Sequence, residues 1–243
     1  AIALMEFANE NDLFAMSVTL EPYRTRFEAM YREWAARNHV VLPEGPINFA
    51  ERTDDLMRFL VEVQRNYYLE MRRFLREEVG VRIPMTGSNW SINAALLAAL
   101  QEMDYTDSHA YWHHPAGDGS VGNTPMLASP VPFFGGLAFQ RMVGKPFFVS
   151  EWDEPWPNEW RAELPCWMSA VAAFQGWNGL TVYTYRHSSA VPIDWLSGAF
   201  ETFNDPARFG LFPAAALMFR RGDVDGARQR TAIVIPEELV ATS

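Results

Sequence analysis

Two glutamates occur where a strand-like run of residues ends. Glu151 follows the apolar run 145–150 and opens a segment rich in Trp and Pro, while Glu10 follows the run 2–8 and is preceded by Asn9. Carboxylates at the ends of buried parallel strands are the means by which barrel enzymes present a catalytic acid to a sugar. The two glutamates therefore form a candidate catalytic pair for glycoside hydrolysis.

Retaining hydrolysis of a glycoside requires two carboxyl groups in different protonation states. One is ionised and attacks the anomeric carbon, while the other donates a proton to the leaving oxygen. Their separation is then about 5–5.5 Å, against roughly 6.5–9.5 Å in inverting enzymes. We expect Glu10 and Glu151 to meet in space at the shorter distance.

Helix and strand signals alternate along the sequence. Apolar residues recur at helical spacing in segments 22–38, 53–80, 91–101, 133–143 and 160–174, and a last helix is framed by Pro213 and Gly222. The predicted strands are 2–8, 81–87, 105–109, 145–150 and 180–184, with a further strand-like run at 231–235. This alternation predicts an α/β fold with parallel strands.

The order of these segments resembles the large clan of retaining glycoside hydrolases built on the TIM (β/α)8 barrel, such as cellulases, mannanases and β-galactosidases. In that clan an Asn-Glu pair closes strand four and a Glu closes strand seven, and Asn9, Glu10 and Glu151 match those positions. The resemblance implies that Glu10 is the general acid/base and Glu151 the nucleophile. It also implies that Asn9 binds the 2-hydroxyl of the sugar.

Further matches follow strands six and eight of the resemblance. His109 and Tyr111 fit a His-x-Tyr pattern in which the Tyr hydroxyl contacts the nucleophile and the His lies beside the site. Tyr185 stands where an aromatic residue, often Trp, closes strand eight. The resemblance therefore implies that all three residues bind substrate.

Only strands four to eight of such a barrel have counterparts in the sequence. We expect an α/β chain that forms the C-terminal portion of a TIM (β/α)8 barrel. Missing strands would come from another chain or from a longer precursor. Residues 1–222 are assigned to this partial catalytic barrel and residues 223–243 to a tail that starts an appended β element. Activity of the chain by itself depends on the missing strands.

Tryptophans are frequent in the loops expected on the catalytic face. Aromatic rings stack on the apolar faces of sugars, although Trp also fills the cores of loops. The candidate sugar contacts of this kind are Trp90, Trp112, Trp152, Trp156 and Trp195.

Other charged residues near the two glutamates have simpler interpretations. Glu6 lies within a strand and is interpreted as structural, and Asp12, Asp153 and Glu154 as loop charges or supports of the site. Glu6 would then face the interior of the barrel or pair with an Arg, and the other three would lie beside the site without touching the substrate.

Histidine is the commonest metal ligand, which directs attention to His113 and His114. Adjacent residues in a loop rarely point at one ion, so we expect no metal and no other cofactor. The glycines of 117–122 lack the strand-to-helix context of a phosphate-binding loop and indicate a flexible loop over the site.

The composition and charge of the chain disfavour some classes of binding partner. A net charge of −10 disfavours nucleic acid and anionic membranes as partners. No apolar run approaches the ~18–20 residues of a membrane helix. The single cysteine, Cys166, is expected to be a buried small hydrophobe. Secreted, periplasmic and cytoplasmic locations all remain open.

The sequence thus predicts a glycosidase, a hydrolase of O-glycosyl bonds, that cleaves a β-linked oligo- or polysaccharide through a covalent glycosyl-enzyme. The first alternative is a non-catalytic carbohydrate-binding protein on an incomplete barrel. A second is a metal-dependent barrel hydrolase or isomerase that uses the histidines, which loss of activity with a chelator would identify. The identity of the sugar, its linkage, the choice of endo or exo action and the oligomeric state stay open.

Overall fold

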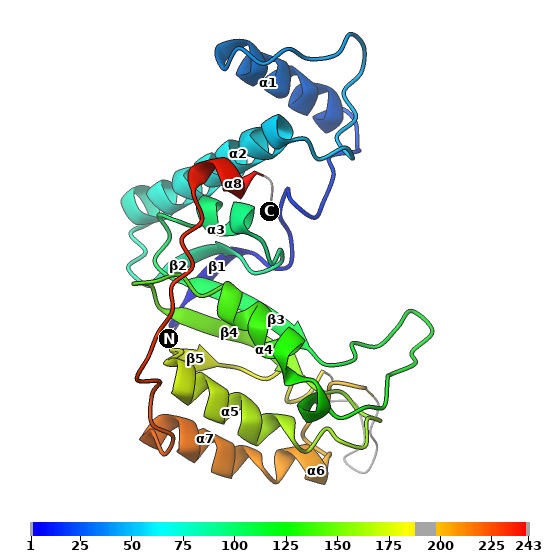
Figure 1. The fold of residues 1–243 in the computed structure, drawn as a ribbon, viewed down its shortest axis with the longest axis vertical. Helices are drawn as coiled ribbons and strands as arrows, with labels where there is room; N and C mark the ends of the chain where they lie inside the picture. The colour runs from blue at the N-terminus through cyan, green and yellow to red at the C-terminus, as the bar shows by residue number, and fades with distance from the viewer. Residues whose placement is uncertain (1, 188–197, 242–243) are drawn as a thin grey trace. The chain divides into compact units, whose positions relative to one another are not determined.

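The computed structural model describes residues 2–187 and 198–241 of the chain (Figure 1). These residues divide into two compact units. The first comprises Ala1–Thr106 with Ile233–Ser243, and the second comprises Asp107–Ala232. The predicted division at residue 222 between barrel and tail is not tested by these units and stays a prediction.

The first unit contains a parallel pair of strands. β1 (Met5–Ala8) pairs with β2 (Met85–Ser88), in a register that places Met5 beside Met85 and Ala8 beside Ser88. The four residues of β2 are all buried. The helical elements of the unit are α1 (Tyr23–Arg37), α2 (Asp54–Phe74) with a π-helical turn η1 (Leu75–Val79), α3 (Ala94–Ala99) and α8 (Glu237–Val240).

Local signals account for the long helix α2. The Thr53 side chain accepts a hydrogen bond from the backbone N–H of Leu56, and Asp54 and Asp55 occupy the first turn, where the helix dipole favours negative charge. The helical stretch ends at Gly80, whose φ of 80° lies in the left-handed region. The predicted helix 53–80 is therefore confirmed in position and length.

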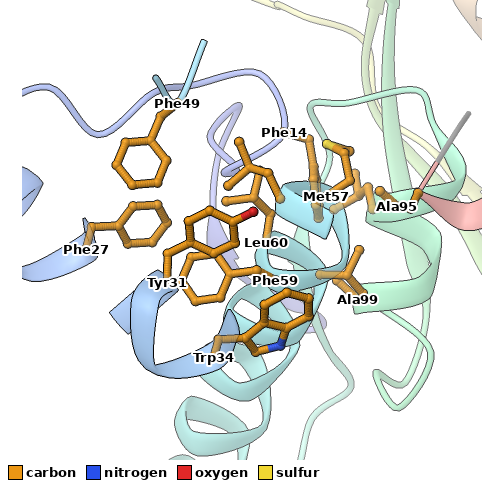
Figure 2. Packing of buried hydrophobic residues seen from close by; sticks show 14 of the residues in the cluster. Phe14, Phe27, Tyr31, Trp34, Phe49, Met57, Phe59, Leu60, Ala95 and Ala99 are labelled. Carbon is orange, nitrogen blue, oxygen red and sulfur yellow. The ribbon is translucent and has the colours of Figure 1, made fainter. Parts of the chain in front are cut away.

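Aromatic side chains of α1 and α2 form the centre of the first core (Figure 2). Phe27, Tyr31 and Trp34 follow one another on one face of α1, at spacings of four and three residues. Their ring centroids lie 5.2, 5.0 and 6.0 Å from that of Phe59 in α2. Large rings buried in this way provide much of the stability of a small unit, so this cluster anchors α1 to α2.

The second unit is built on three strands in the order β3-β4-β5. These are β3 (Thr106–Tyr111), β4 (Phe147–Asp153) and β5 (Gly179–Leu180), and β5 runs parallel to β4. The helical elements are η2 (Met126–Ala128), α4 (Pro130–Phe139), α5 (Leu164–Gln175), α6 (Pro206–Phe209) and α7 (Phe212–Arg221).

Helix α5 lies between this sheet and α7 (Figure 1). Leu164, Met168 and Ala172, spaced by four residues on α5, pack with Phe147 and Val149 of β4 in one fully buried cluster. The α5 helix ends at Gly176, and α7 ends at Gly222, both in the left-handed conformation. The predicted helix framed by Pro213 and Gly222 is thus confirmed.

The predicted barrel is wrong for this structure. The five strands of the described residues form two separate small sheets, one of two strands and one of three, and they do not close into a barrel. The sequence pattern identified the alternation of strands and helices correctly. It could not decide which strands hydrogen-bond to one another, because strand pairing depends on contacts between segments distant in the chain.

Several element boundaries also differ from the sequence predictions. β4 continues to Asp153, so Glu151 lies inside the strand and not after it. β5 is shorter than the predicted strand 180–184, although the backbone N–H of Thr181 still donates to Val149. Residues 231–235 adopt no strand.

Within the described part of the chain, no helix combines the length and apolar character needed to cross a bilayer.

Candidate functional site

Glu151, near the carboxyl end of β4, contacts two side chains of the neighbouring strand β3. The phenol of Tyr111 donates a hydrogen bond to Oε2 of Glu151, and Nδ1 of His109 lies 3.4 Å from the same oxygen. Tyr111 and His109 are two residues apart in a strand and therefore share a face. The Glu151 side chain is 19% exposed, so a ligand can reach its carboxylate.

Ser150 and Asp107 support His109 on the other side of its ring. Nε2 of His109 lies 2.9 Å from Oγ of Ser150. The backbone N–H groups of Ser150 and Ser108 donate to Oδ1 of Asp107 at 2.9 and 2.7 Å. Burial raises the pKa of Asp107 to about 6, against the opposing effect of these hydrogen bonds and of His109.

Aromatic rings surround the phenol that holds Glu151. The ring centroid of Tyr111 lies 4.9 Å from that of Phe200, 5.2 Å from that of His114 and 6.3 Å from that of Tyr183. These contacts restrict the ring orientation of half-buried Tyr111. The hydroxyl is thereby directed to one position.

The predicted aromatic contacts of the second unit differ in accessibility. Tyr185 is 58% exposed and Trp156 is 38% exposed, so both present open ring surface. Trp112 is half-buried, and its indole N–H donates to the carbonyl of Thr124. Trp152 is buried and packs against Phe212, which leaves no ring face for a sugar. Trp195 lies outside the described residues.

The Asn9–Glu10 turn of the first unit follows β1 and is tied to the end of β2. The side chain of Asn89 accepts a hydrogen bond from the Glu10 backbone N–H at 2.9 Å and donates to Glu6 at 2.7 Å and to Asn9 at 3.2 Å. Glu10 itself has a φ of 48°, a left-handed conformation that is uncommon for a residue with a side chain. Backbone strain of this kind is frequent at functional sites. Trp90, next to Asn89, is 40% exposed.

Asp12 fixes the chain directly after this turn. Its buried carboxylate accepts hydrogen bonds from the backbone N–H groups of Phe14 and Ala15 and from both the N–H and the hydroxyl of Ser91, all at 2.8–2.9 Å. Four donors on one buried carboxylate join the segments after β1 and β2. The interpretation of Asp12 as a loop charge or a support of the site stays a prediction.

A buried network of charges lies beyond Glu151 in the second unit. Arg208, 1% exposed, places Nη1 2.5 Å from Asp153 and Nε 3.0 Å from Asp205. Arg161 binds both oxygens of Asp205, at 2.6 and 3.2 Å. Burial raises the pKa of Asp153 to about 7 against the opposing charge of Arg208. For Asp205, burial is outweighed by the two arginines, and the pKa is lowered.

Glu154 lies beside this network but differs from its aspartates, which are paired with arginines. It is fully buried, and neither carboxyl oxygen has a hydrogen-bond partner among the described residues. Burial raises its pKa to about 8, and the charges of Glu163 and Asp153 add to that rise. The sequence interpretation as a loop charge did not anticipate burial of a neutral acid, because no local pattern predicts it.

The adjacent His113 and His114 make polar contacts with residues of the loop in which they lie. Nε2 of His113 lies 2.5 Å from the hydroxyl of Thr124, and Nδ1 of His114 lies 3.0 Å from the carbonyl of Pro115. These ring nitrogens are engaged in holding the loop. The geometry of the pair gives no support to its use as a metal site.

A groove of about 460 Å³ opens on the first unit beside the residues that flank the Asn9–Glu10 turn. Asn11 and Leu13 line it after β1, with Tyr23 and Arg26 of α1 and Tyr67 of α2. Its volume is within the range of small-molecule sites. The sequence analysis did not single out these α1 and α2 residues.

The structure thus gathers Glu151, Tyr111 and His109 in the second unit and orders Asn9 and Glu10 in the first. Ser150 and Asp107 were missed as functional candidates, although the two-residue spacing of Asp107, His109 and Tyr111 places all three on one strand face.

Comparison of the chain with protein-family models, curated proteins and solved structures finds no match.

Proposed function

We propose that this protein is a retaining glycosidase in which Glu151 is the nucleophile and Glu10 the general acid/base. The hydrogen bond from Tyr111 to Glu151 is the observation that carries the proposal. A phenol in this position donates a hydrogen bond to the carboxylate and holds it in one orientation, as an attacking group requires.

The reaction then proceeds in two displacements. An oxygen of Glu151 attacks the anomeric carbon, the bond to the leaving oxygen breaks, and Glu10 transfers its proton to that oxygen. A water molecule next attacks the anomeric carbon, Glu10 takes its proton, and the bond to Glu151 breaks. The amide of Asn9 binds the 2-hydroxyl, where a hydrogen bond strengthens as the transition state forms. His109 and Tyr111 hold the nucleophile.

The proposed substrate is a β-linked oligo- or polysaccharide. Tyr185, Trp156 and Trp90 present exposed ring surface on which the apolar face of a sugar can stack. Trp152 is not included, because its ring is buried. No cofactor enters the proposed reaction.

Trapping with 2-deoxy-2-fluoro glycosides tests the proposal directly. These compounds leave a long-lived glycosyl-enzyme in retaining glycosidases, so we expect an adduct on Glu151 after incubation with the appropriate sugar. Intact-mass and peptide-mapping measurements identify the labelled residue and the sugar together. A Glu151→Gln variant is the control and should give no adduct.

A non-catalytic carbohydrate-binding protein is the second candidate, and the groove beside Asn11 and Tyr67 favours it. Binding of an oligosaccharide by the folded chain, measured by calorimetry, without an adduct from any fluoro-sugar, would support this alternative. An adduct on Glu151 would reject it.

A further inference from the structure

The arginines of helix α1 differ in whether they have an acidic partner. Arg24, Arg32 and Arg37 each form an ion pair with a glutamate, at nitrogen–oxygen distances of 2.8, 2.7 and 3.6 Å. Arg26 is exposed, and its side chain has no ion pair or hydrogen bond with any residue that the structure describes. It lines the groove of the first unit instead. Its guanidinium is therefore available to a ligand in that groove.

The walls of the groove around Arg26 are aromatic and apolar. Tyr23 of α1 is 67% exposed and Tyr67 of α2 is 42% exposed, and both line the groove. Tyr23 and Arg26 are three residues apart and lie on one face of α1. Met30 and Val63 extend the apolar lining. The groove thus offers open ring surface next to a positive charge.

A buried amide adds a hydrogen-bond donor to the same groove. Gln64 lines the groove and is 6% exposed, and its Oε1 accepts a hydrogen bond from the backbone N–H of Leu13 at 3.0 Å. This contact fixes which end of the amide is the oxygen. The NH2 group at the other end has no hydrogen-bond partner among the described residues. Polar groups of buried side chains are normally paired, so a ligand hydroxyl in the groove can supply the missing acceptor.

Asp12 is the acidic residue among those that line the groove, and its carboxylate is already satisfied. It is 3% exposed and accepts four hydrogen bonds at 2.8–2.9 Å. The net charge of −10 acts over longer distances and is largely screened beyond about 8 Å at physiological ionic strength. An anion beside Arg26 therefore meets an unpaired cation and no open carboxylate.

These features match a sugar that carries a carboxylate. A pyranose ring stacks its apolar face on aromatic rings and presents hydroxyl groups at its edge. In a uronic acid the carboxylate also stands at that edge, where a guanidinium can bind it with two parallel hydrogen bonds. Ala8 and Asn11, on either side of Asn9 and Glu10 in the sequence, line the groove. A sugar bound there lies next to that turn.

We propose that the groove of the first unit binds a uronic acid residue of a β-linked polysaccharide. Arg26 binds the carboxylate, and Gln64 donates to a hydroxyl group. Tyr23 and Tyr67 contact the apolar face of the sugar ring. The substrate is thereby narrowed to an acidic polysaccharide, which rests on the proposed function, whereas binding in the groove requires no catalysis.

Calorimetry with matched oligosaccharides tests this assignment. The probes are the tetrasaccharides of β-1,4-linked glucuronate and of β-1,4-linked mannuronate. Each is compared with the neutral tetrasaccharide of glucose or mannose that has the same linkage, so that the members of a pair differ only in the carboxylate. The full chain carries Glu151→Gln, which should turn over no glycoside, and binding is then measured without hydrolysis.

We expect an oligouronate to bind about tenfold or more tightly than its neutral counterpart, and added salt should reduce this preference. Arg26→Gln should abolish the preference and leave the affinity for the neutral tetrasaccharide unchanged. Arg37→Gln, which changes an arginine of α1 outside the groove whose side chain is 69% exposed, is the matched control and should keep the preference. Tyr67→Ala should weaken binding of both members of a pair, and Tyr67→Phe, which retains the ring, should not.

Equal binding of charged and neutral tetrasaccharides would overturn the proposal, as would a preference that survives Arg26→Gln or the absence of binding to all four probes. Tighter binding of 3-phenylpropionate than of either oligouronate would assign the groove to a simple apolar acid and also overturn it.

The groove and the proposed function can fail separately. A carboxylate preference that Arg26→Gln abolishes, together with no fluoro-sugar adduct on the unaltered protein, would reject the enzyme and keep the groove as a site for acidic sugars. An adduct on Glu151 without a carboxylate preference would keep the enzyme and reject the assignment of the groove.

Discussion

Tyr111 donates a hydrogen bond to Glu151 across two neighbouring strands of one sheet. Residue 111 closes β3, and Glu151 lies two residues before the end of β4. The donor and acceptor are therefore held by backbone elements and not by a loop, which limits their relative motion. A carboxylate supported in this way keeps a constant orientation, as the proposed nucleophile requires.

Tyr111→Phe removes this hydrogen bond and leaves the ring contacts in place. Hydrogen bonds to charged groups contribute about 1.5–3 kcal/mol, so we expect kcat/KM to fall roughly 10- to 100-fold. Thr25→Val, which removes an exposed hydroxyl on α1, is the control and should leave kcat/KM unchanged. A Tyr111→Phe enzyme of unaltered kcat/KM would show that the phenol does not support the nucleophile.

Replacement of the two glutamates should give different kinetic results. Glu151→Gln removes the proposed nucleophile, so no glycoside should be turned over. Glu10→Gln removes the proposed proton donor, whose loss matters least for leaving groups that depart without protonation. Initial rates on dinitrophenyl and alkyl glycosides of the same sugar measure the contrast.

In Glu10→Gln the first step with the dinitrophenyl glycoside should be retained, while turnover of the alkyl glycoside should be lost. Equal losses on both substrates would contradict the assignment of Glu10 as the acid. Glu21→Gln, an exposed change on the first unit, controls for the effect of replacing a surface carboxylate.

Asp12→Asn should destabilise the first unit. All four groups that contact the Asp12 carboxylate are hydrogen-bond donors, and an amide NH2 group would face one of them. We expect the free energy of unfolding to fall by roughly 1–3 kcal/mol, the cost of leaving a buried donor unsatisfied. Urea unfolding measures the change, with the exposed Glu51→Gln as control. Equal midpoints would show that Asp12 does not hold the segments together.

Glu154 makes stability depend on pH. Its folded-state pKa is raised from 4.5 to about 8, so between these values the unfolded chain releases a proton that the folded protein retains. The free energy of unfolding should therefore decrease as pH rises from 4.5 to about 8. Asp107 and Asp153 contribute in the same direction only up to about pH 6 and 7, so Glu154→Gln should flatten the slope chiefly between about pH 7 and 8. The variant should be more stable than the unaltered protein by roughly 1–3 kcal/mol at about pH 9.

Urea unfolding at several pH values measures both slopes. Glu159→Gln, an exposed residue of the same segment, is the control and should keep the slope of the unaltered protein. If Glu154→Gln retains that slope as well, Glu154 is not the group that titrates.

Local patterns in the sequence predicted much of the secondary structure. Apolar spacing located α2, and the pair Pro213 and Gly222 located α7, because both helices are specified by neighbouring residues. His109 and Tyr111 were singled out by the resemblance alone. The predicted strand 105–109 matches the start of β3, which continues to Tyr111. These features depend on backbone geometry over a few residues, which the sequence determines by itself.

The tertiary structure alone decided how these elements combine. Strand pairing produced two small sheets in place of the predicted barrel, because hydrogen bonds between strands join segments that are distant in the chain. The pairing of β3 with β4 also places Asp107 beside Ser150. The packing of α6 buries Arg208 between Asp153 and Asp205. Burial and charge partners of a side chain depend on the packing of the whole unit, and no local pattern of residues encodes them.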